Sequence, residues 1–495
     1  MAEGRVAINV VMSILNTSIF ASCIQRKLGI GFHNVGTGVL RASDTATIEY
    51  VEAQYGQRCG HIPLDAEEAG VLVEVRTTDI QTHLDYLSQL FGKKIKAITA
   101  SELQHEQRRL PGQPALIVPY INVPEAEKRI EGQLGAESWG MAADMVGLLK
   151  NKADFYQLLD EFNLDGFQTP DYRIAHVADL PRQALGFLGT VEELVKKAGV
   201  SRYPLGVMLR AAESDGNYGC SLVHEQGDRV RVVLNGEADH ASYFTNWDEA
   251  LAVSQKHLAS TMNQQREARI VVSRYLDMAD SPGMSVVIID GQVESLGWNS
   301  QLQKKGSKAC VGTSTYRAKN ASLVRLQQEY EGQTADFFEK LLRKTAQKFG
   351  VDFASLRCVA NIDIMLPGKL EEGLQKKRGQ KPVRYIAECN PRWTNYTDAI
   401  MTIIGVSRKE QTIDTIRAVI REGIATIDKY HLPENADPRI VREYILQRDE
   451  VLKREGTRVI CRMAKNPMGL IFAGDVKRAQ REIAGITRRL ASKRV

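Results

Sequence analysis

The chain has 495 residues, of which 43% are apolar and 25% charged, and its formal net charge is +5. These values are ordinary for a globular protein of about three domains or subdomains, and no arginine-rich arm or interleaved aromatic patch points to nucleic acid. Seven scattered cysteines without a CxxC pair predict reduced thiols in a cytoplasmic protein rather than zinc or disulfides.

The first region, residues 1–145, is predicted to be a small parallel α/β domain. Apolar strands are expected at 5–12, 70–76 and 114–121, with a helix of regular apolar spacing at 80–94. Polar residues in the first apolar run argue against a signal peptide. Uninterrupted apolar runs of about 18 residues are absent, so no membrane-spanning helix is expected.

The middle region, residues 146–405, begins with two helical segments that meet near Asn151 and Lys152. From about residue 203 the pattern changes to hairpins, which end near residue 275 and enclose one helix at 246–260. Further on, "DG" at 290–291 separates two apolar runs and predicts a tight turn.

A long helix is expected at 322–349, followed by strands at 357–366 and 383–390. The charged segment between these strands, 367–382, is predicted to be a mobile, solvated hairpin tip, with a substrate-contacting lid as the alternative. In the last region, 406–495, helices dominate before a final strand, strand and helix.

The stretch "VRYIAECNPRWTNYTDAI", residues 383–400, carries the first chemical signal. Strand alternation places Glu388 and Asn390 on one face and Cys389 on the other. If the preceding strand pairs with it in antiparallel fashion, Asp363 joins them, and three oxygen-bearing side chains then suit Mg²⁺. Arg392 follows Pro391, which lacks an N–H group and so ends the backbone hydrogen bonding of the strand. The alternative is a set of salt-bridged strand ends.

The stretch "VMLRAAESDGNYGCSL" carries the second signal. Arg210 ends a strand, and a loop with Gly216 and Gly219 follows. Glycine lets backbone N–H groups approach phosphate closely, and a cation at the strand end neutralises it. Most such loops are plain hairpin turns, but a metal cluster further along the chain favours a nucleotide site.

Taken together, these pieces resemble the ATP-grasp superfamily over about residues 145–400. The matching segments occur in the family's order: "NKADFYQLLDEFNLDGFQTP", "LRAAESDGNYGC", "VVSRYLD" and "IDIML...YIAECNPR". The resemblance implies an ATP-grasp fold of the α/β (α+β) class, with a pre-ATP-grasp domain before it and a mainly helical extension after it. The closing "GLIFAGDVKRAQREI" resembles pheganomycin-type peptide ligases.

The resemblance also implies roles for individual residues. Lys152 and Arg210 would contact ATP phosphates, and the hairpins at about 203–275 would form a lid. The loop closing over the phosphates would comprise Ser214, Asp215, Gly216, Asn217 and Gly219. The segment bordering the adenine would comprise Ser273, Arg274, Tyr275 and Leu276, with Asp277 or Asp280 on the ribose. Mg²⁺, as two ions, would be held by Asp363, Glu388 and Asn390, with Arg392 facing the transferred phosphate.

Two positions depart from the family pattern. Many members have Lys where Arg210 stands, and Glu or Gln where Ser273 stands. Arginine keeps the charge but not the point-like geometry of an ammonium group. We refer to the adenine-bordering segment, 273–276, as the hinge. Backbone groups of this hinge would then bind the adenine in place of the Ser273 side chain.

The expected activity is ATP-dependent joining of a small-molecule carboxylic acid to an amine through an acyl phosphate. Residues near 300–316 and the "WTNYTDA" segment are expected to contribute to substrate specificity. Two alternatives stay open: a carboxylase or carbamoyl-transferring enzyme of the same superfamily, and a regulatory protein that binds nucleotide without turnover. A homodimer is also left open.

Overall fold

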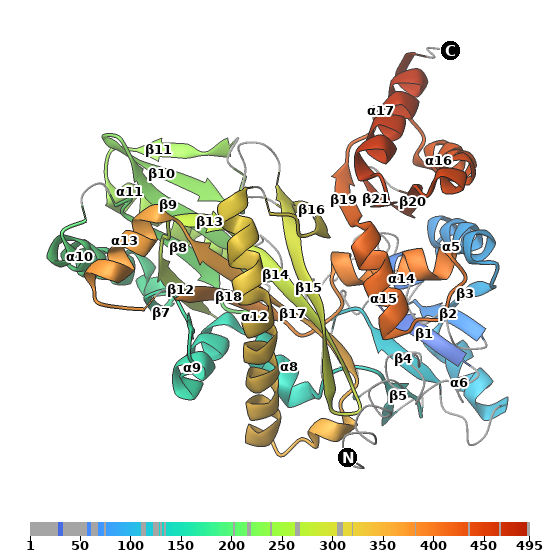
Figure 1. Ribbon diagram of the computed structural model, residues 1–495, viewed down its shortest axis with the longest axis horizontal. Helices are drawn as coiled ribbons and strands as arrows, with labels where there is room; N and C mark the ends of the chain where they lie inside the picture. Colours follow the sequence, from blue (N-terminus) through green and yellow to red (C-terminus); the bar gives the residue numbers. More distant parts are fainter. Residues whose placement is uncertain are drawn as a thin grey trace.

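The structure is a computed structural model, in which three sheets lie side by side (Figure 1). A ten-stranded central sheet lies between a six-stranded lid sheet and a five-stranded N-terminal sheet. The residues that it describes are 28–32, 57–60, 68–73, 76–109, 115–121, 128, 131–132, 135–200, 203–214, 219–237, 240–262, 268–303, 310–318, 320–381, 383–433, 436–464 and 467–492. Helices and strands are both abundant among these residues, so the predicted mixed α/β class is confirmed.

The N-terminal sheet is parallel throughout, in the order β3-β2-β1-β4-β5. Its strands are β1 (Leu28–Phe32), β2 (Glu68–Leu72), β3 (Ile95–Ile98), β4 (Leu116–Pro119) and β5 (Glu137–Ser138). Its helices are α4 (Gln57–Cys59), α5 (Thr78–Phe91) and α6 (Ala100–Arg109). The predicted parallel strand arrangement, the helix near 80–94 and the strands near 70–76 and 114–121 are confirmed. The strand predicted at 5–12 lies outside the described residues.

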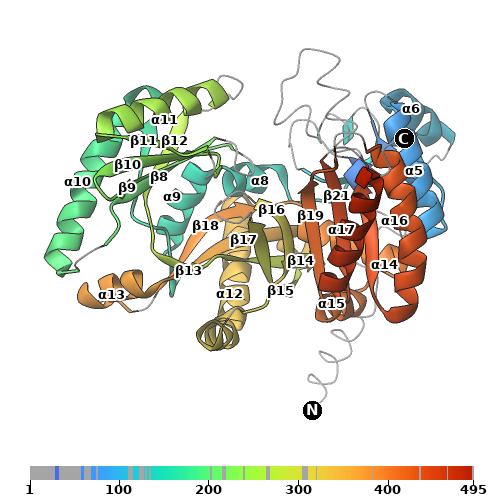
Figure 2. The same cartoon turned by 90° about the horizontal axis from the view of Figure 1, so that it is seen from above.

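The lid sheet is antiparallel, in the order β11-β10-β9-β8-β12-β7. Its strands are β7 (Tyr172–His176), β8 (Gly206–Ala211), β9 (Cys220–Gln226), β10 (Arg229–Leu234), β11 (Ser242–Phe244) and β12 (Arg269–Arg274). Two helices, α10 (Leu180–Ala198) and α11 (Trp247–Met262), pack on it and share its apolar core (Figure 2). The predicted hairpins are confirmed, and the sheet also includes β7 from before residue 203.

The central sheet runs in the order β20-β21-β19-β16-β15-β14-β17-β18-β6, with β13 beside β17. Its strands up to β18 are β6 (Phe167–Gln168), β13 (Met278–Asp280), β14 (Pro282–Ile289), β15 (Gln292–Gln303), β16 (Cys310–Thr315), β17 (Cys358–Pro367) and β18 (Arg384–Asn390). The helices packed near it are α8 (Ala143–Lys150), α9 (Lys152–Phe162) and α12 (Ala321–Lys348). The long helix α12 is the one predicted at 322–349.

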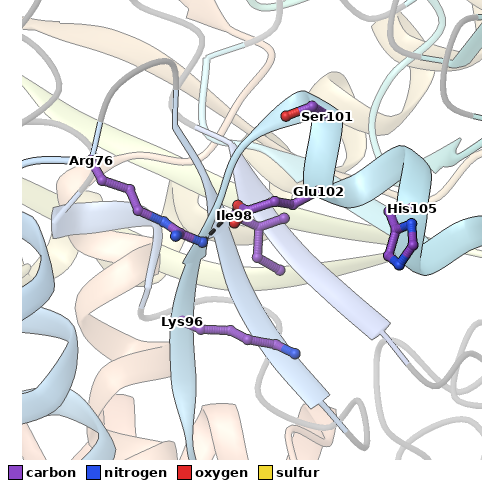
Figure 3. A pocket seen from close by; sticks show the side chains of 6 residues that line it. All are labelled: Arg76, Lys96, Ile98, Ser101, Glu102 and His105. Atoms are coloured by element: carbon purple, nitrogen blue, oxygen red, sulfur yellow. Dashed lines mark hydrogen bonds and ion pairs between the residues drawn. The ribbon is translucent and has the colours of Figure 1, made fainter.

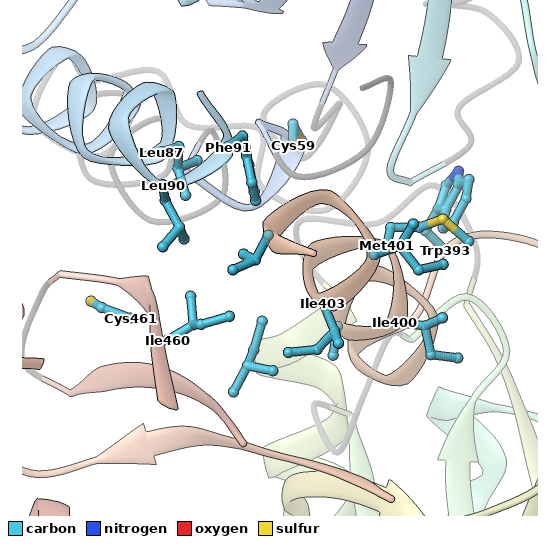
Figure 4. Close-up of a cluster of buried hydrophobic side chains, with 14 of the residues drawn as sticks. Cys59, Leu87, Leu90, Phe91, Trp393, Ile400, Met401, Ile403, Ile460 and Cys461 are labelled. Atoms are coloured by element: carbon cyan, nitrogen blue, oxygen red, sulfur yellow. The ribbon is translucent and has the colours of Figure 1, made fainter. Parts of the chain in front are cut away.

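The C-terminal region continues the central sheet. Its strands are β19 (Ile424–Tyr430), β20 (Arg458–Met463) and β21 (Met468–Ala473), and its helices are α14 (Asn395–Val406), α15 (Ile413–Glu422), α16 (Pro438–Leu452) and α17 (Val476–Ser492). The predicted closing strand, strand and helix are β20, β21 and α17. Side chains of α5, α14 and β20 meet in one core, as Leu87, Ile403 and Ile460 show in Figure 4.

The segment 367–382 differs from the prediction of a solvated hairpin tip. Residues Lys369–Lys377 form a helix, α13, and its Glu371, Leu374 and Gln375 are buried. These three positions follow helical spacing, but two of them are polar, so the hydrophobic pattern did not indicate a buried face. The helix packs its Leu374 into the core of the lid sheet.

The turn between β14 and β15 confirms the "DG" prediction. Asp290 and Gly291 have φ values of 47° and 75°, as a two-residue hairpin with positive φ at both positions requires. None of the helices in the described residues is both long enough and apolar enough to cross a membrane.

Gly291 offers a test of this turn. A Cβ added there would lie 3.1 Å from the Cα of Ala354, and the positive φ disfavours a side chain. We expect Gly291→Ala to lower the free energy of unfolding by about 1–2 kcal/mol in urea denaturation. The control is Gly189→Ala in α10, where an added Cβ meets nothing within 4 Å; it should raise that free energy by up to about 1 kcal/mol. Equal effects would contradict the argument.

Candidate active site

The acidic residues of β17 and β18 face one another across an antiparallel pair. Asp363 is in register with Glu388, and Asn361 is in register with Asn390. The amide Nδ2 of Asn390 donates to Asp363 Oδ2 at 3.3 Å and to Glu388 Oε1 at 3.4 Å. The structure therefore brings together Asp363, Glu388 and Asn390, as the predicted pairing requires. Cys389, which was predicted to lie on the opposite face of the strand, is buried.

Two cationic side chains approach this cluster from other elements. Lys152 begins α9 behind the Asn151 cap, is 4% exposed, and places its Nζ 3.3 Å from Glu388 Oε2. The same Nζ donates to the carbonyl of Ser214. Arg210, on β8 of the lid sheet, donates from Nη1 to the Ala387 carbonyl at 2.9 Å. The two side chains that were predicted to contact phosphate thus both bind residues of β18.

Arg210 is further held by an aromatic side chain. Its Nη2 donates to the hydroxyl of Tyr156, and its guanidinium lies 5.3 Å from the centre of that ring. Tyr156 is fully buried in α9. The lid sheet, α9 and β18 are therefore joined at the cluster through this one arginine.

The pKa values of the two carboxyl groups in the cluster are shifted in opposite directions. Burial and the neighbouring Glu388 raise the pKa of Asp363 to about 7. Burial also opposes ionisation of Glu388, but Lys152 and Arg210 outweigh it, and the pKa of Glu388 lies below its usual value. A divalent cation between the two carboxylates would take the place of the proton on Asp363.

A glycine lies beside Asp363 in the sheet, and neighbouring side chains fill the space above it. Gly283 on β14 pairs with Asn299 of β15 on one side and with Asp363 on the other. A Cβ on Gly283 would lie 2.7 Å from Asn299 Oδ1 and 2.9 Å from Asp363 Oδ1. It would also lie 3.0 Å from Asn361 Oδ1. Oxygen atoms thus converge over a residue without a side chain.

The donor set fits a hard divalent cation such as Mg²⁺, which takes oxygen ligands and only a few of them from protein. Asp363 and Glu388 would supply carboxylate oxygens and Asn390 an amide oxygen. No cluster of three His, Cys, Asp or Glu side chains that could hold a metal occurs among the residues described above. A metal here would therefore depend on two carboxylates, an amide and oxygens of the substrate.

The loop predicted to cover phosphate is described only at its two ends. Ser214 is buried, and its Oγ donates to the Ala211 carbonyl at 3.0 Å. Gly219 has a φ of 68°, and its carbonyl accepts from Ala211 N–H at 2.8 Å. The residues of this loop that lie outside the described part of the chain include Asp215, Gly216 and Asn217.

The segment predicted to border the adenine packs tightly against its neighbours. Ser273 Oγ donates to the Met208 carbonyl at 3.3 Å, and the Tyr275 ring stacks on His224 with centroids 5.3 Å apart. Leu276 is 5% exposed. The Ser273 hydroxyl therefore serves the lid sheet in this structure.

Arg274 occupies a buried ion-pair network. Its Nη1 and Nη2 donate to the two carboxylate oxygens of Glu371 at 2.7 and 2.9 Å, and both side chains have no exposed surface. Its Nε donates to Asp171 at 2.9 Å. Tyr385 of β18 donates to Glu371 at 2.6 Å. The arginine side chain thus ties the hinge to α13 and to the central sheet.

The two aspartates proposed for the ribose also have protein partners. Asp277 Oδ2 accepts from the Leu370 N–H at 2.9 Å, near the start of α13. Asp280 accepts from its neighbour Ser281 N–H at 3.0 Å and from the Tyr316 hydroxyl at 3.3 Å. Asp277 therefore helps to begin α13.

Arg392 follows the end of β18 and is held by backbone groups next to it in the sequence. Its N–H donates to the Asn390 carbonyl at 2.8 Å, and its Nη1 donates to the Trp393 carbonyl at 3.1 Å. Burial raises the pKa of both Asp363 and Tyr120, and the positive charge of Arg392 opposes each shift. Tyr120 follows β4, so the charge of Arg392 acts on groups of both the central and the N-terminal sheets.

Two groups of polar residues were missed from the sequence. One group consists of Asn361, Ser285 and Asn299, which are hydrogen-bonded to one another next to Asp363. Asn361 is two positions before Asp363, so strand alternation alone would have placed it on the same face as Asp363. The other surrounds Arg462 of β20, which is buried against Asp398 and Asp428. Contacts between residues so distant in the chain leave no local pattern.

A separate pocket lies in the N-terminal region (Figure 3). It has a volume of 360 Å³ and is lined by Arg76, Lys96, Ile98, Ser101, Glu102 and His105. Glu102 accepts from Arg76 at 2.6 Å and from Thr99 N–H at 2.9 Å. Arg76 and Glu102 are therefore already paired with each other at the start of α6.

Comparisons with known proteins gave matches among solved structures. No family model matches the chain, and no curated protein matches it. Biotin carboxylase from Campylobacter jejuni is 11% identical with a TM-score of 0.49, covering 93% of this chain and 90% of its own. L-Amino acid ligase from Bacillus licheniformis is also 11% identical, with a TM-score of 0.45, covering 93% and 97%.

A third similar structure is N5-carboxyaminoimidazole synthase from Aspergillus clavatus, in complex with ADP and 5-aminoimidazole ribonucleotide. It is 10% identical with a TM-score of 0.48, covering 85% of this chain and 98% of its own. All three TM-scores are below 0.5.

Proposed function

We propose that this chain is an ATP-grasp ligase that activates a carboxylic acid as an acyl phosphate and joins it to an amine. The observation that carries the proposal is the meeting of Asp363 and Glu388 with two cations, Lys152 and Arg210, at the junction of the lid sheet and β18. Two opposed carboxylates beside two fixed cations suit a magnesium-bound triphosphate.

Each part of the site then has a role in binding ATP. Lys152 and Arg210 neutralise phosphate charge, and the loop from Ser214 to Gly219 covers the phosphates. The segment 273–276 borders the adenine through its backbone, and Asp280 takes the ribose. Mg²⁺, when bound by Asp363, Glu388 and Asn390, supplies positive charge against the phosphate oxygens.

The chemistry consists of two displacements. A carboxylate oxygen of the acid attacks the γ-phosphorus, and the bond from that phosphorus to the departing ADP oxygen breaks. The amine nitrogen then attacks the acyl carbon, phosphate leaves with the electron pair of the C–O bond, and the amine gives up a proton. Arg392, next to the cluster, stabilises the charge that develops on the transferred group.

No protein nucleophile is needed for this sequence of steps. Cys389 lies between Glu388 and Asn390 on β18, but it is buried, and burial raises its pKa well above the ordinary value. A neutral, buried thiol is a poor nucleophile. The acid and the amine are small molecules; a cytoplasmic location and a homodimer stand as further parts of the proposal.

The experiment is a pairwise screen of acids and amines with Mg²⁺ and ATP, following ADP release. Release that requires both members of a pair supports the ligase. Release with bicarbonate as the acid would support the carboxylase alternative. Nucleotide binding without turnover in any combination would support the regulatory alternative. Glu388→Gln serves as the inactive control, so that contaminating ATPase activity is subtracted.

A further inference from the structure

Three buried polar side chains form a chain of hydrogen bonds that ends at Asp363. Asn361, Ser285 and Asn299 come from β17, β14 and β15 and are 4%, 0% and 4% exposed. Ser285 Oγ donates to Asn361 Oδ1 at 2.9 Å, and Asn299 Nδ2 donates to the same oxygen at 3.0 Å. Asn361 Nδ2 donates to Asp363 Oδ1 at 2.8 Å.

This series of hydrogen bonds allows the Asn361 amide only one orientation. Its Oδ1 receives two donors, so the Nδ2 group must be the one that faces Asp363. The opposite orientation would set its NH₂ group against the NH₂ group of Asn299 and its oxygen against a carboxylate oxygen. Since Asn299 Nδ2 also donates to Ser285 Oγ at 3.1 Å, the three side chains support one another.

We propose that Asn361 is a positioning residue that orients the Asp363 carboxylate for metal binding, with Ser285 and Asn299 holding Asn361 in turn. This inference rests on the function proposed above. The hydrogen bond from Asn361 holds Asp363 Oδ1 in place. The other carboxylate oxygen, Asp363 Oδ2, then faces Asn390, whose Nδ2 lies 3.3 Å away. Hydrogen-bond partners of metal ligands typically contribute about 10- to 100-fold in metal affinity.

The location of these hydrogen-bonded side chains favours a role at the Asp363 and Glu388 cluster over a role in folding alone. Asn361 is in register with both Ser285 and Asn390, and Asp363 is in register with Gly283 and Glu388. The polar residues therefore occupy one continuous face across neighbouring strands. Apolar side chains would fill these buried positions at no cost in unpaired polar groups.

The test measures metal and nucleotide binding separately. Mn²⁺ is the probe, titrated by electron paramagnetic resonance in the presence of a non-hydrolysable ATP analogue, and the analogue alone is titrated in EDTA. We expect Asn361→Leu to raise the Kd for Mn²⁺ by about 10- to 100-fold while the Kd for the analogue in EDTA stays unchanged. Ser285→Ala, a milder change, should raise the Mn²⁺ Kd less, in the same direction.

The control is Thr345→Val on α12, which removes a buried hydroxyl that donates to the Leu341 carbonyl at 2.7 Å. Its Mn²⁺ Kd should equal that of the wild type. Unchanged Mn²⁺ binding in both Asn361→Leu and Ser285→Ala, or an equal weakening of the analogue in EDTA, would overturn the inference. A wild type that binds no Mn²⁺ with the analogue would overturn the proposed function and this inference with it.

Discussion

Glu388→Gln is expected to reduce Mg²⁺-dependent ATP turnover on the order of 10²-fold or more, as the loss of one charge-stabilising group in an enclosed site does. Glutamine keeps the shape of the side chain but removes the charge that opposes Lys152 at 3.3 Å. The measurement is ADP release with a productive acid and amine pair, alongside the circular dichroism spectrum. Because the replacement has the same shape, the spectrum should match that of the wild type.

Asn390→Asp tests the same cluster from the opposite direction. A third carboxylate there would lie within hydrogen-bond range of the positions of Asp363 Oδ2 and Glu388 Oε1, where the amide now donates. Repulsion among three acids is expected to lower turnover sharply. The matched control is Glu372→Gln on the exposed face of α13, which should keep the wild-type rate. Wild-type rates in both site variants would refute the assignment of the cluster.

Strand alternation and chain proximity were enough to predict the acidic cluster. Glu388 and Asn390 share a face whatever the rest of the fold, and Asp363 is on the strand that precedes theirs in the chain. The observed register pairs Asp363 with Glu388 directly. The same reasoning reaches Asn361, two positions earlier. Ser285 and Asn299 need the register of β14 and β15, which no local pattern supplies.

Helix α13 shows where pattern-based prediction fails. Its buried face carries Glu371 and Gln375, so the segment looks solvated until the partner of Glu371 is known. That partner, Arg274, is 97 positions away in the chain. A polar residue is buried where a charge or hydrogen bond compensates it, and a contact of such long range is invisible to periodicity.

The C-terminal region gives a related example. The strands β20 and β21 are continuous buried runs and were predicted, whereas β19 was not. The β19 strand reads IATIDKY, in which Thr426, Asp428 and Lys429 interrupt the apolar residues, and it follows α15 directly after Gly423. Its pairing with β21 and β16 places it inside the sheet. Neighbouring strands thus decide its structure.

Glu371→Leu is expected to lower the free energy of unfolding by about 3–5 kcal/mol, because it leaves Arg274 buried without its main counter-charge. Both side chains have no exposed surface, and two hydrogen bonds of 2.7 and 2.9 Å join them. The measurement is the shift of the urea unfolding transition. The double variant Arg274→Met, Glu371→Leu removes both charges and should be less destabilised than Glu371→Leu alone.

The pH dependence gives a second check on the same pair. Burial alone would raise the pKa of Glu371, but its bonds to Arg274 outweigh this, so the folded pKa lies below the ordinary value. The stability that the pair contributes is therefore fully present above the unfolded pKa of about 4.3 and is lost as the pH falls through the folded pKa. Glu371→Gln should flatten this part of the acid-stability profile. A double variant as unstable as Glu371→Leu, or a Glu371→Gln profile as steep as that of the wild type, would show that the pair does not hold the hinge.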